Sequence, residues 1–231
     1  MNMDDYIREF IEKLNDKSWS VRSSAIRNLG SILERNPDNE QLVKIIVPHL
    51  RNALKDDDDD VCLWAANTLE TASFAYPGHP EIIKAIPLLF EALWDEEEDV
   101  EYTAADALVT MGKHGISALC KAVLTDSETN ERKFARHNLK NEITNAASLN
   151  RLDEIQEGCE IAFSELKSSQ LPGRTKEKAE MEVRMFELLA DILRRKARLS
   201  KDGEILTGET IKRPKGRKGR KYQEIRRCRN G

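Results

Sequence analysis

Aromatic residues, cysteines and long apolar runs are all scarce in this chain of 231 residues, which has 6% aromatics and four cysteines. The longest stretch without a charged residue, residues 71–80, is far shorter than the roughly 20 apolar residues that cross a bilayer. It also contains Pro77, Gly78 and Pro80, so it is typical of a helix end and a turn. The N-terminus lacks the basic and apolar regions of a secretory signal. These absences predict a cytoplasmic protein without membrane contact.

The residues that usually carry chemistry are also few and scattered. The cysteines are Cys62, Cys120, Cys159 and Cys228, and the histidines are His49, His79, His114 and His137. They form no CxxC pair and no HExxH, and neither a P-loop, GxGxxG nor GxSxG occurs. The sequence therefore predicts buried or free thiols in a reducing compartment, and no catalytic residue, metal site or cofactor.

Charge is distributed unevenly although the net charge is only −4. Residues 1–120 hold 11 Lys/Arg against 23 Asp/Glu, and residues 121–200 hold 15 against 14. Residues 201–231 hold 11 against four, so the C-terminal end is strongly basic. Such polarity carries information about partners and not about the fold.

A repeat of about 40 residues gives the strongest signal in the sequence. A leading Leu is followed at fixed offsets by Asp (+2), Val (+7), Ala (+11) and Leu (+15). The three copies are Leu14, Asp16, Val21, Ala25, Leu29; Leu54, Asp56, Val61, Ala65, Leu69; and Leu93, Asp95, Val100, Ala104, Leu108. A weaker fourth copy is Leu124, Asp126, Glu131, Ala135, Leu139. Positions four apart share one face of a helix, so each copy predicts a helix pair whose apolar face is covered by its neighbours.

Within each copy, the leading Leu is expected to end one helix. The Asp two residues later lies in a short turn, where its carboxylate can cap the next helix. The small Ala lets two helices approach closely.

This pattern, with Val21-Arg22 and Leu29-Gly30 in the first copy, resembles the HEAT repeat over residues 4–147. Pro87 also resembles the proline that kinks the first helix of many HEAT units. Cys62 and Glu101 stand where the family often has Arg, which weakens an Asp-to-Arg ladder between repeats. The resemblance implies an all-α, right-handed α-α superhelix, a HEAT-like solenoid. Together with the last pair and the C-terminal charge, the sequence predicts about five antiparallel helix pairs followed by a basic C-terminal tail.

Helix boundaries follow from the repeat and the turn residues. First helices are predicted near 4–15, 39–55, 79–94 and 115–125, and second helices near 18–35, 58–74, 97–112 and 128–147. A last pair, near 149–169 and 174–199, is expected to cap the solenoid with two apolar stripes. The stripes are Leu152, Ile155, Cys159, Ala162, Phe163, Leu166 and then Ala179, Val183, Phe186, Leu189, Ala190, Leu193. The predicted units are a four-repeat solenoid (1–147), a capping pair (148–200) and a tail (201–231).

Two acidic runs, residues 56–60 and 95–99, occupy equivalent turns and are expected to lie side by side on one edge. One interpretation is helix capping plus a hydrated rim, because carboxylates are favourable at helix N-termini. A second is a docking ridge for a basic partner, and a third is a cation site. The candidate rim residues are Asp57, Asp58, Asp59, Glu96, Glu97 and Glu98.

Positions two and six residues after the repeat Val are expected on the concave face, opposite the core. Ser23 takes the first of these positions. The candidate binding residues there are Arg27, Leu63, Asn67, Glu70, Tyr102, Asp106, Lys133, His137 and Lys140. Solenoids commonly bind an extended peptide or a helix along such a face. A plain solvated face is the alternative. Trp64 is predicted to pack in the core.

The C-terminal segment 211–231 carries ten Lys/Arg and one Glu, interrupted by glycines and a proline. This composition suits an extended arm that contacts phosphates. Its candidate nucleic-acid residues are Lys212, Arg213, Lys215, Arg217, Lys218, Arg220, Lys221, Tyr222, Arg226, Arg227 and Arg229. The alternatives are an end without function and an arm that folds back onto the acidic rim.

Three functional hypotheses follow. The first is a non-catalytic scaffold or adaptor that binds a protein partner. The second is a nucleic-acid or ribonucleoprotein-associated factor anchored by the tail. The third, implied only by HEAT-like folds that include a DNA glycosylase and bilin lyases, is an accessory subunit of a lyase. A glycosylase needs aromatic residues in a basic cleft, but Trp64 and Tyr102 lie in the acidic half.

Overall fold

In a computed structural model of the chain, the described residues are 3–125, 133–168 and 175–201. The side chains at 133–134, 175–179 and 201 are outside this description. Within the described ranges every regular element is a helix, which confirms the predicted all-α solenoid. The helices are α1 (Met3–Lys13), α2 (Trp19–Arg35), α3 (Glu40–Ala53), α4 (Asp59–Ala75), α5 (Pro80–Ile83), α6 (Ile86–Glu91), the 3-10 helix η1 (Ala92–Trp94), α7 (Glu98–Thr110), α8 (Gly112–Thr125), α9 (Lys133–Asn145), α10 (Leu149–Ser168) and α11 (Thr175–Lys201).

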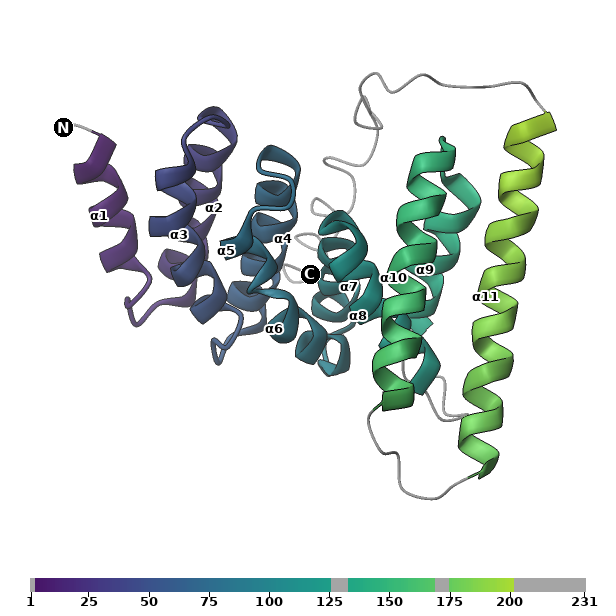
Figure 1. Cartoon of the computed structure of the whole chain (residues 1–231). Coiled ribbons are helices and arrows are strands. Elements are labelled where there is room, and N and C mark those ends of the chain that lie inside the picture. Colours follow the sequence, from purple (N-terminus) through teal and green to yellow (C-terminus); the bar gives the residue numbers. More distant parts are fainter. Residues whose placement is uncertain (1–2, 126–132, 169–174, 202–231) are drawn as a thin grey trace, which may run out of the picture.

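The helices stack in two layers along one elongated molecule (Figure 1). The first helices of the pairs (α1, α3, α5 with α6, α8 and α10) contact one another in sequence and form one layer. The second helices α2, α4, α7 and α9 form the other, called here the second-helix layer. Helix α11 closes the end of the stack, where it contacts α8, α9 and α10. This is the stacking that the repeat predicts.

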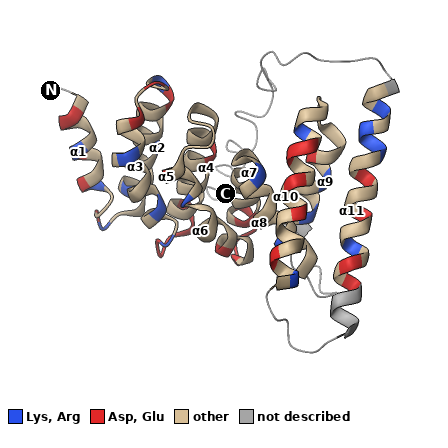
Figure 2. Cartoon of the chain, viewed as in Figure 1, with Lys and Arg blue, Asp and Glu red and all other residues tan. Residues whose placement is uncertain are grey.

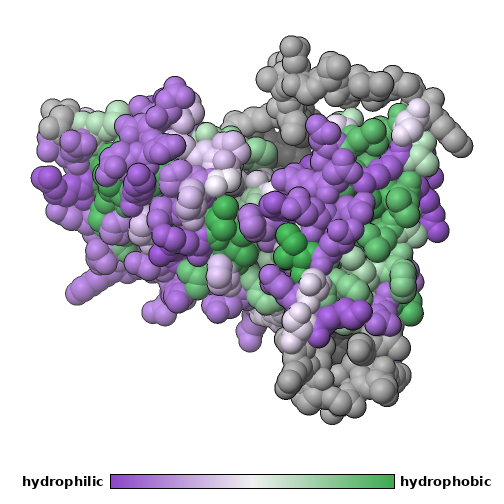
Figure 3. Space-filling view, viewed as in Figure 1, coloured by the Kyte–Doolittle hydropathy of each residue, from purple (hydrophilic) through white to green (hydrophobic). Residues whose placement is uncertain are grey.

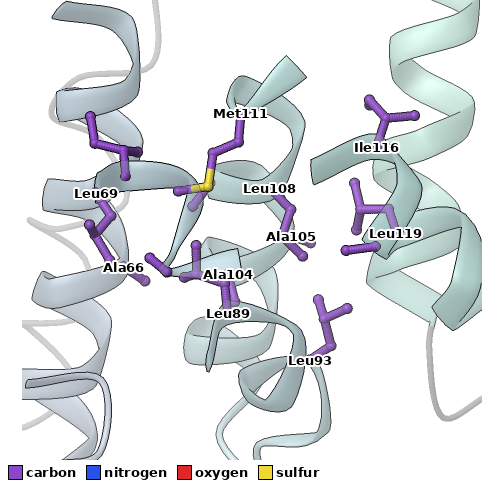
Figure 4. Packing of buried hydrophobic residues seen from close by; sticks show 14 of the residues in the cluster. Ala66, Leu69, Leu89, Leu93, Ala104, Ala105, Leu108, Met111, Ile116 and Leu119 are labelled. Carbon is purple, nitrogen blue, oxygen red and sulfur yellow. The ribbon is translucent and has the colours of Figure 1, made fainter. Parts of the chain in front are cut away.

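The repeat positions form the core between the layers. Val61, Ala65 and Leu69 are at most 1% exposed, and the equivalent side chains of α2 and α7 are buried with them, apart from the half-buried Val21, as are Ala135 and Leu139 of α9. Figure 4 shows this packing around α7, where Ala104, Ala105 and Leu108 lie between residues of α4, α6 and α8. Small alanine side chains at these positions let the helices approach closely. The assigned core face is therefore confirmed.

Leucine at either of two core alanines should overpack the interior. Ala65 and Ala104 have no exposed surface, so three added carbon atoms must displace neighbouring helices. We expect Ala65→Leu and Ala104→Leu each to lower the free energy of unfolding by about 1–3 kcal/mol. Urea titration followed by circular dichroism measures this, and an unchanged midpoint in both variants would contradict the packing.

The first helix of the third pair is interrupted, whereas the sequence predicted one helix over 79–94. Helix α5 ends at Ile83, four residues before Pro87, and α6 begins at Ile86. A proline has no N–H for the carbonyl four residues earlier, and its ring collides with that carbonyl. Pro80 and Pro87 instead stand in the first turns of α5 and α6, where no intrahelical donor is needed.

The repeat aspartates shape the turns before the second helices. They were predicted to cap these helices, and that prediction is wrong. The carboxylates of Asp16, Asp56 and Asp95 each accept a hydrogen bond from the backbone N–H two residues later, at 2.8, 3.1 and 3.0 Å. Each of these short loops ends at the residue that takes the N-cap position of the next helix, namely Ser18, Asp58 and Glu97. A side chain two residues before the cap is too far back to reach the first free amides of the helix.

The last pair buries the expected face of α10 but a different face of α11. In α10, Leu152, Ile155, Cys159 and Ala162 are fully buried, as predicted. In α11 the buried side chains are Met181, Met185, Leu188, Ile192 and Leu199, whereas Val183, Phe186 and Leu193 are 56%, 70% and 60% exposed. The prediction for α11 is wrong because two apolar stripes with the same helical spacing run along this helix. The division of the chain into three units stays a prediction.

Candidate partner-binding surfaces

Four residues at the same repeat position form a row across the second-helix layer. Arg27, Asn67, Asp106 and His137 each lie six residues after the repeat Val position, on α2, α4, α7 and α9. Arg27 and His137 are exposed, and Asn67 and Asp106 are half-buried. Because the helices are consecutive neighbours, these side chains follow one another along the open side of the layer. They are called the polar row below.

Local contacts hold parts of this row in place. The Arg27 guanidinium lies over the Trp64 ring, with 4.7 Å between the guanidinium carbon and the ring centroid. The Asn141 amide lies 2.8 Å from Nε2 of His137. Trp64 is partly buried and packs against the core, as predicted, but its ring also supports Arg27 at the surface. A guanidinium stacked on indole is held in one orientation.

The other candidate residues of this face differ in exposure. Lys140 is exposed, and Tyr102 and Glu70 are half-buried. Leu63 is only 9% exposed and packs with Cys62 and Val100 between α4 and α7, and Ser23 is also buried. In α2 and α4, a position two residues after the Val faces the adjacent helix, so Ser23 and Leu63 belong to the helix contact. The side chain of Lys133 is outside the described residues.

The acidic edge contains carboxylates with two different roles. Asp56 binds Arg22, Asp58 accepts a hydrogen bond from the backbone N–H of Asp60 at 3.1 Å, and Asp95 shapes its own turn. Asp57, Asp59, Glu96, Glu97 and Glu98 point to solvent. Figure 2 shows the two turns in red along the lower edge of the solenoid. The edge therefore combines structural carboxylates with a solvated acidic rim.

An ion pair connects the first two repeats at this edge. Nε and an Nη atom of Arg22 donate to the two carboxylate oxygens of Asp56 at 2.8 and 2.5 Å, and the guanidinium also donates to the carbonyl of Asp16 at 2.9 Å. The bond to Asp56 raises the pKa of Arg22 above its ordinary value. In the next repeat the equivalent residue is Cys62, whose Sγ donates instead to the carbonyl of Asp56 at 3.2 Å.

The described cysteines should be unreactive in the native protein. Burial raises the pKa of Cys62 to about 11, with the charges of Asp95 and Asp56 adding to the shift. Burial, together with the hydrogen bond to Cys159, raises the pKa of Cys120 well above its ordinary value. A raised thiol pKa keeps the neutral form below about pH 11, so at pH 8 about one Cys62 in 1,000 is a thiolate.

We therefore expect Ellman's reagent to leave Cys62, Cys120 and Cys159 unmodified at pH 8 and to titrate four thiols after denaturation. Rapid native reaction of two or more thiols would contradict this. Cys228 lies outside the described residues.

No arrangement of chemical groups in the described part of the chain indicates catalysis. A polar cavity of about 390 Å³ opens beside the Arg22–Asp56 pair, with His49 and Lys55 on its wall, and Asp56 is already engaged there. Within the described ranges, no three His, Cys, Asp or Glu side chains converge on a position suitable for a metal ion. The search for a helix long and apolar enough to cross a membrane finds none there either.

The basic tail, including every candidate nucleic-acid residue from Lys212 to Arg229, lies outside the described residues. Its proposed phosphate contacts stay a prediction from composition.

Known protein families match the part of the chain that contains the repeats. The family described as HEAT repeats matches residues 47–140, and the family described as HEAT-like repeat matches residues 19–71. No curated protein gives a significant match. Among solved structures, an engineered protein is 20% identical over 90% of this chain and 91% of its own, with a TM-score of 0.46. A designed armadillo repeat protein is 18% identical over 85% and 88%, with a TM-score of 0.45. The complex of CpcE and CpcF of phycocyanin lyase from Nostoc sp. PCC7120 is 21% identical over 79% and 82%, with a TM-score of 0.29.

Proposed function

The chain belongs to the HEAT-repeat family, and from this premise we propose that it is a non-catalytic scaffold that binds an extended segment of a protein partner along its second-helix layer. The observation that carries the proposal is the polar row of Arg27, Asn67, Asp106 and His137 on four consecutive helices. Equivalent positions on stacked helices present side chains at a regular interval, which suits a partner with its own regular interval.

The spacing of the row matches extended backbone. Packed helices lie about 8–10 Å apart, and a polyproline-II-like extended chain has three residues per turn with a rise of about 3.1 Å per residue. Every third side chain of such a segment therefore points the same way and comes opposite the next helix of the layer. Asn67, near the middle, carries both an amide donor and a carbonyl acceptor, so it is suited to bind the peptide backbone.

The charges of the row indicate which segment fits. Arg27 at one end and Lys140, three residues from His137, at the other favour acidic residues, whereas Asp106 between them favours a basic residue. The half-buried rings of Trp64 and Tyr102 offer apolar contact beside these charges. The expected ligand is a mixed-charge segment with one basic residue between acidic ones.

A charge reversal within the row tests this proposal. The row variant combines Arg27→Glu with Asp106→Arg, which leaves the net charge unchanged. The matched control combines Lys44→Glu with Glu91→Arg, both exposed on the first-helix layer. Immobilised proteins are compared by quantitative mass spectrometry of what they capture from the native cell lysate, after circular dichroism has established equal helix content.

We expect the control to capture the same proteins as the unmodified chain and the row variant to lose at least one of them tenfold or more. Equal capture by all three would overturn the proposal. A third variant, Asp57→Asn with Glu96→Gln and Glu97→Gln, separates the row from the acidic rim. Selective loss in this variant would assign the partner to the rim.

The basic tail favours a second candidate function, a nucleic-acid or ribonucleoprotein-associated factor. Ten Lys/Arg in residues 211–231 would release counterions from a phosphate backbone. The test is a salt titration of binding to generic duplex DNA and to RNA, with and without residues 211–231. Tail-dependent binding with a log–log slope of about −0.9 per phosphate contact on DNA would support it. No binding at low salt would remove it.

A further inference from the structure

The outer face of α11 carries an apolar stripe that nothing in the described part of the chain covers. Its members are Val183, Phe186, Ala190, Leu193 and Ala197. Val183, Phe186 and Leu193 are more than half exposed, Ala197 is exposed and Ala190 is half-buried. Hydrophobic surface is visible along this end of the molecule in Figure 3. Large exposed apolar side chains that line up along one helix mark an interaction site.

The spacing of this stripe is that of a coiled coil. Successive members are separated by three, four, three and four residues, which is the alternation of the two core positions in a heptad. The opposite face of α11 buries Met181, Met185, Leu188 and Ile192 against the solenoid. Helix α11 therefore has two apolar faces, with its polar residues along the two edges between them. The last helix of a repeat array ordinarily has a polar outer face.

We propose that the outer face of α11 binds the outer face of α11 of a second copy of this chain. The two helices run antiparallel, and the twofold axis crosses them at the level of Leu188. In this register Val183 lies opposite Leu193 of the second copy, and Phe186 lies opposite Ala190 of the second copy. The largest side chain of the stripe thus faces the smallest, from both sides of the axis. Such alternation of large and small residues lets two helices interdigitate.

Charge along α11 selects this orientation and this partner. The two rows that flank the stripe carry Glu180, Glu182 and Glu187 in the N-terminal half, and Arg194 and Lys196 in the C-terminal half. An antiparallel pair brings Glu180 beside Arg194 of the second copy, and Glu182 beside Lys196 of the second copy. A parallel pair brings acidic halves together and basic halves together, which is unfavourable. The helix is therefore complementary to itself only when reversed.

The existing ion pairs of these residues leave room for the contact. Arg194 donates to Asp191 on its own helix at 2.7 Å and is 70% exposed, so it can reach a second carboxylate. Lys196 lies 2.6 Å from Asp153 of α10, and Glu182 lies 3.9 Å from Lys167, both on the side toward α10. Of the two cations, Arg194 is the more accessible, at 70% exposure against 22% for Lys196.

One position opposes the pairing. Glu187 is exposed beside Phe186 and meets Glu187 of the second copy at the twofold axis. Two like charges at the centre weaken the dimer, as does its size, because a single helix pair is at the low end of stable interfaces. We expect a dimer that dissociates in the micromolar range.

Sedimentation velocity of the full chain over micromolar concentrations tests the proposal. The expected mass rises from 26.4 kDa toward twice that value as concentration increases. Phe186→Glu with Leu193→Glu should remain monomeric and folded, because both side chains are exposed in the monomer. Glu187→Gln should lower the dissociation constant at least threefold while its helix content by circular dichroism stays unchanged. A chain that stays monomeric at every concentration, or a Glu187→Gln variant that dimerises no better, would overturn the proposal.

Cross-linking fixes the register and tests the other occupants. In a Cys228→Ser background, Glu187→Cys should cross-link to itself between chains with a short bismaleimide, and Arg194→Cys should not. Arg194→Cys mixed with Glu180→Cys should cross-link. Self-linkage of Arg194→Cys and not of Glu187→Cys would contradict the antiparallel register. With Cys228 retained, an intrachain link from Glu187→Cys to Cys228 in a monomer would assign the stripe to the chain's own tail and overturn the dimer.

Discussion

Replacing Gly115 with alanine is expected to lower the free energy of unfolding by about 3 kcal/mol. A Cβ atom at this position, in the first turn of α8, would lie 1.9 Å from the carbonyl oxygen of Leu108 and 3.0 Å from Cβ of Met111. The main obstacle is backbone of α7, which cannot rotate away as a side chain can. The helix propensity of alanine favours the change by only about 1 kcal/mol, so the overlap decides the sign.

Chemical denaturation of Gly115→Ala measures this effect, and Gly30→Ala supplies the control. A Cβ atom at Gly30 would lie 2.7 Å from Cγ2 of Thr68 on α4, which is the end of a side chain. We expect a smaller loss there, and Thr68→Ser should restore most of it because serine lacks that methyl group. Full stability of Gly115→Ala would show that α7 and α8 are not packed as closely as described.

The second large effect is expected at Arg151, where Arg151→Met should cost about 2 kcal/mol. The guanidinium donates to Glu142 at 3.1 and 2.8 Å, to Glu154 at 2.5 Å and to the carbonyl of Val109 at 3.0 Å. It thereby joins the ends of α7 and α9 to the start of α10. Burial lowers the pKa of Arg151, but the two carboxylates raise it by more. Methionine keeps the aliphatic volume and removes the charge, which leaves both carboxylates together without their cation.

Lys113→Met is the matched control for Arg151→Met. Lys113 also connects α8 to α10, through Glu157 at 2.7 Å, but both side chains of this pair are largely exposed. Exposed pairs contribute little, so we expect a change below about 0.5 kcal/mol. A double-mutant cycle of Arg151→Met with Glu142→Gln isolates the half-buried pair. Equal effects of Arg151→Met and Lys113→Met would contradict the difference in burial.

The sequence predicted most of the fold because the repeat marks core positions directly. Val61, Ala65 and Leu69 are buried where the four-residue spacing placed them, and the helices of the first two pairs end within a few residues of prediction. Chain positions that recur with the same chemistry report the same environment, so one correct assignment fixes the others.

Two features lay beyond that reasoning. The resemblance marked Pro87 as a kinking proline, but it did not show that the helix ends at Ile83 and restarts at Ile86, because Pro48 stands within the unbroken helix α3. The buried face of α11 depends on which of two equal stripes meets α8 and α10. Hydrophobic spacing shows that a face is apolar, and only the arrangement of the neighbouring helices shows which apolar face is covered.

The candidate surface was predicted in part for the same reason. Arg27, Asn67, Asp106 and His137 share a repeat offset, and the structure gives each of them at least partial exposure. Leu63, at a neighbouring offset, belongs to the contact between α4 and α7. A rotation of a few tens of degrees decides between the two outcomes, and residue spacing does not resolve it.

We expect Cys62 to make one junction between repeats softer than its neighbour. The first two repeats are joined at their edge by the ion pair of Arg22 with Asp56, whereas Cys62, at the equivalent position of the second repeat, makes its hydrogen bond within its own repeat and only packs against Val100 of the third. The angle between neighbouring repeats should therefore vary more at the junction of the second and third repeats, between Asn67 and Asp106, than at the junction of the first and second, between Arg27 and Asn67. A ligand whose spacing departs slightly from that of the helices can then be accommodated by bending at this one junction, without moving Arg27 from the ring of Trp64.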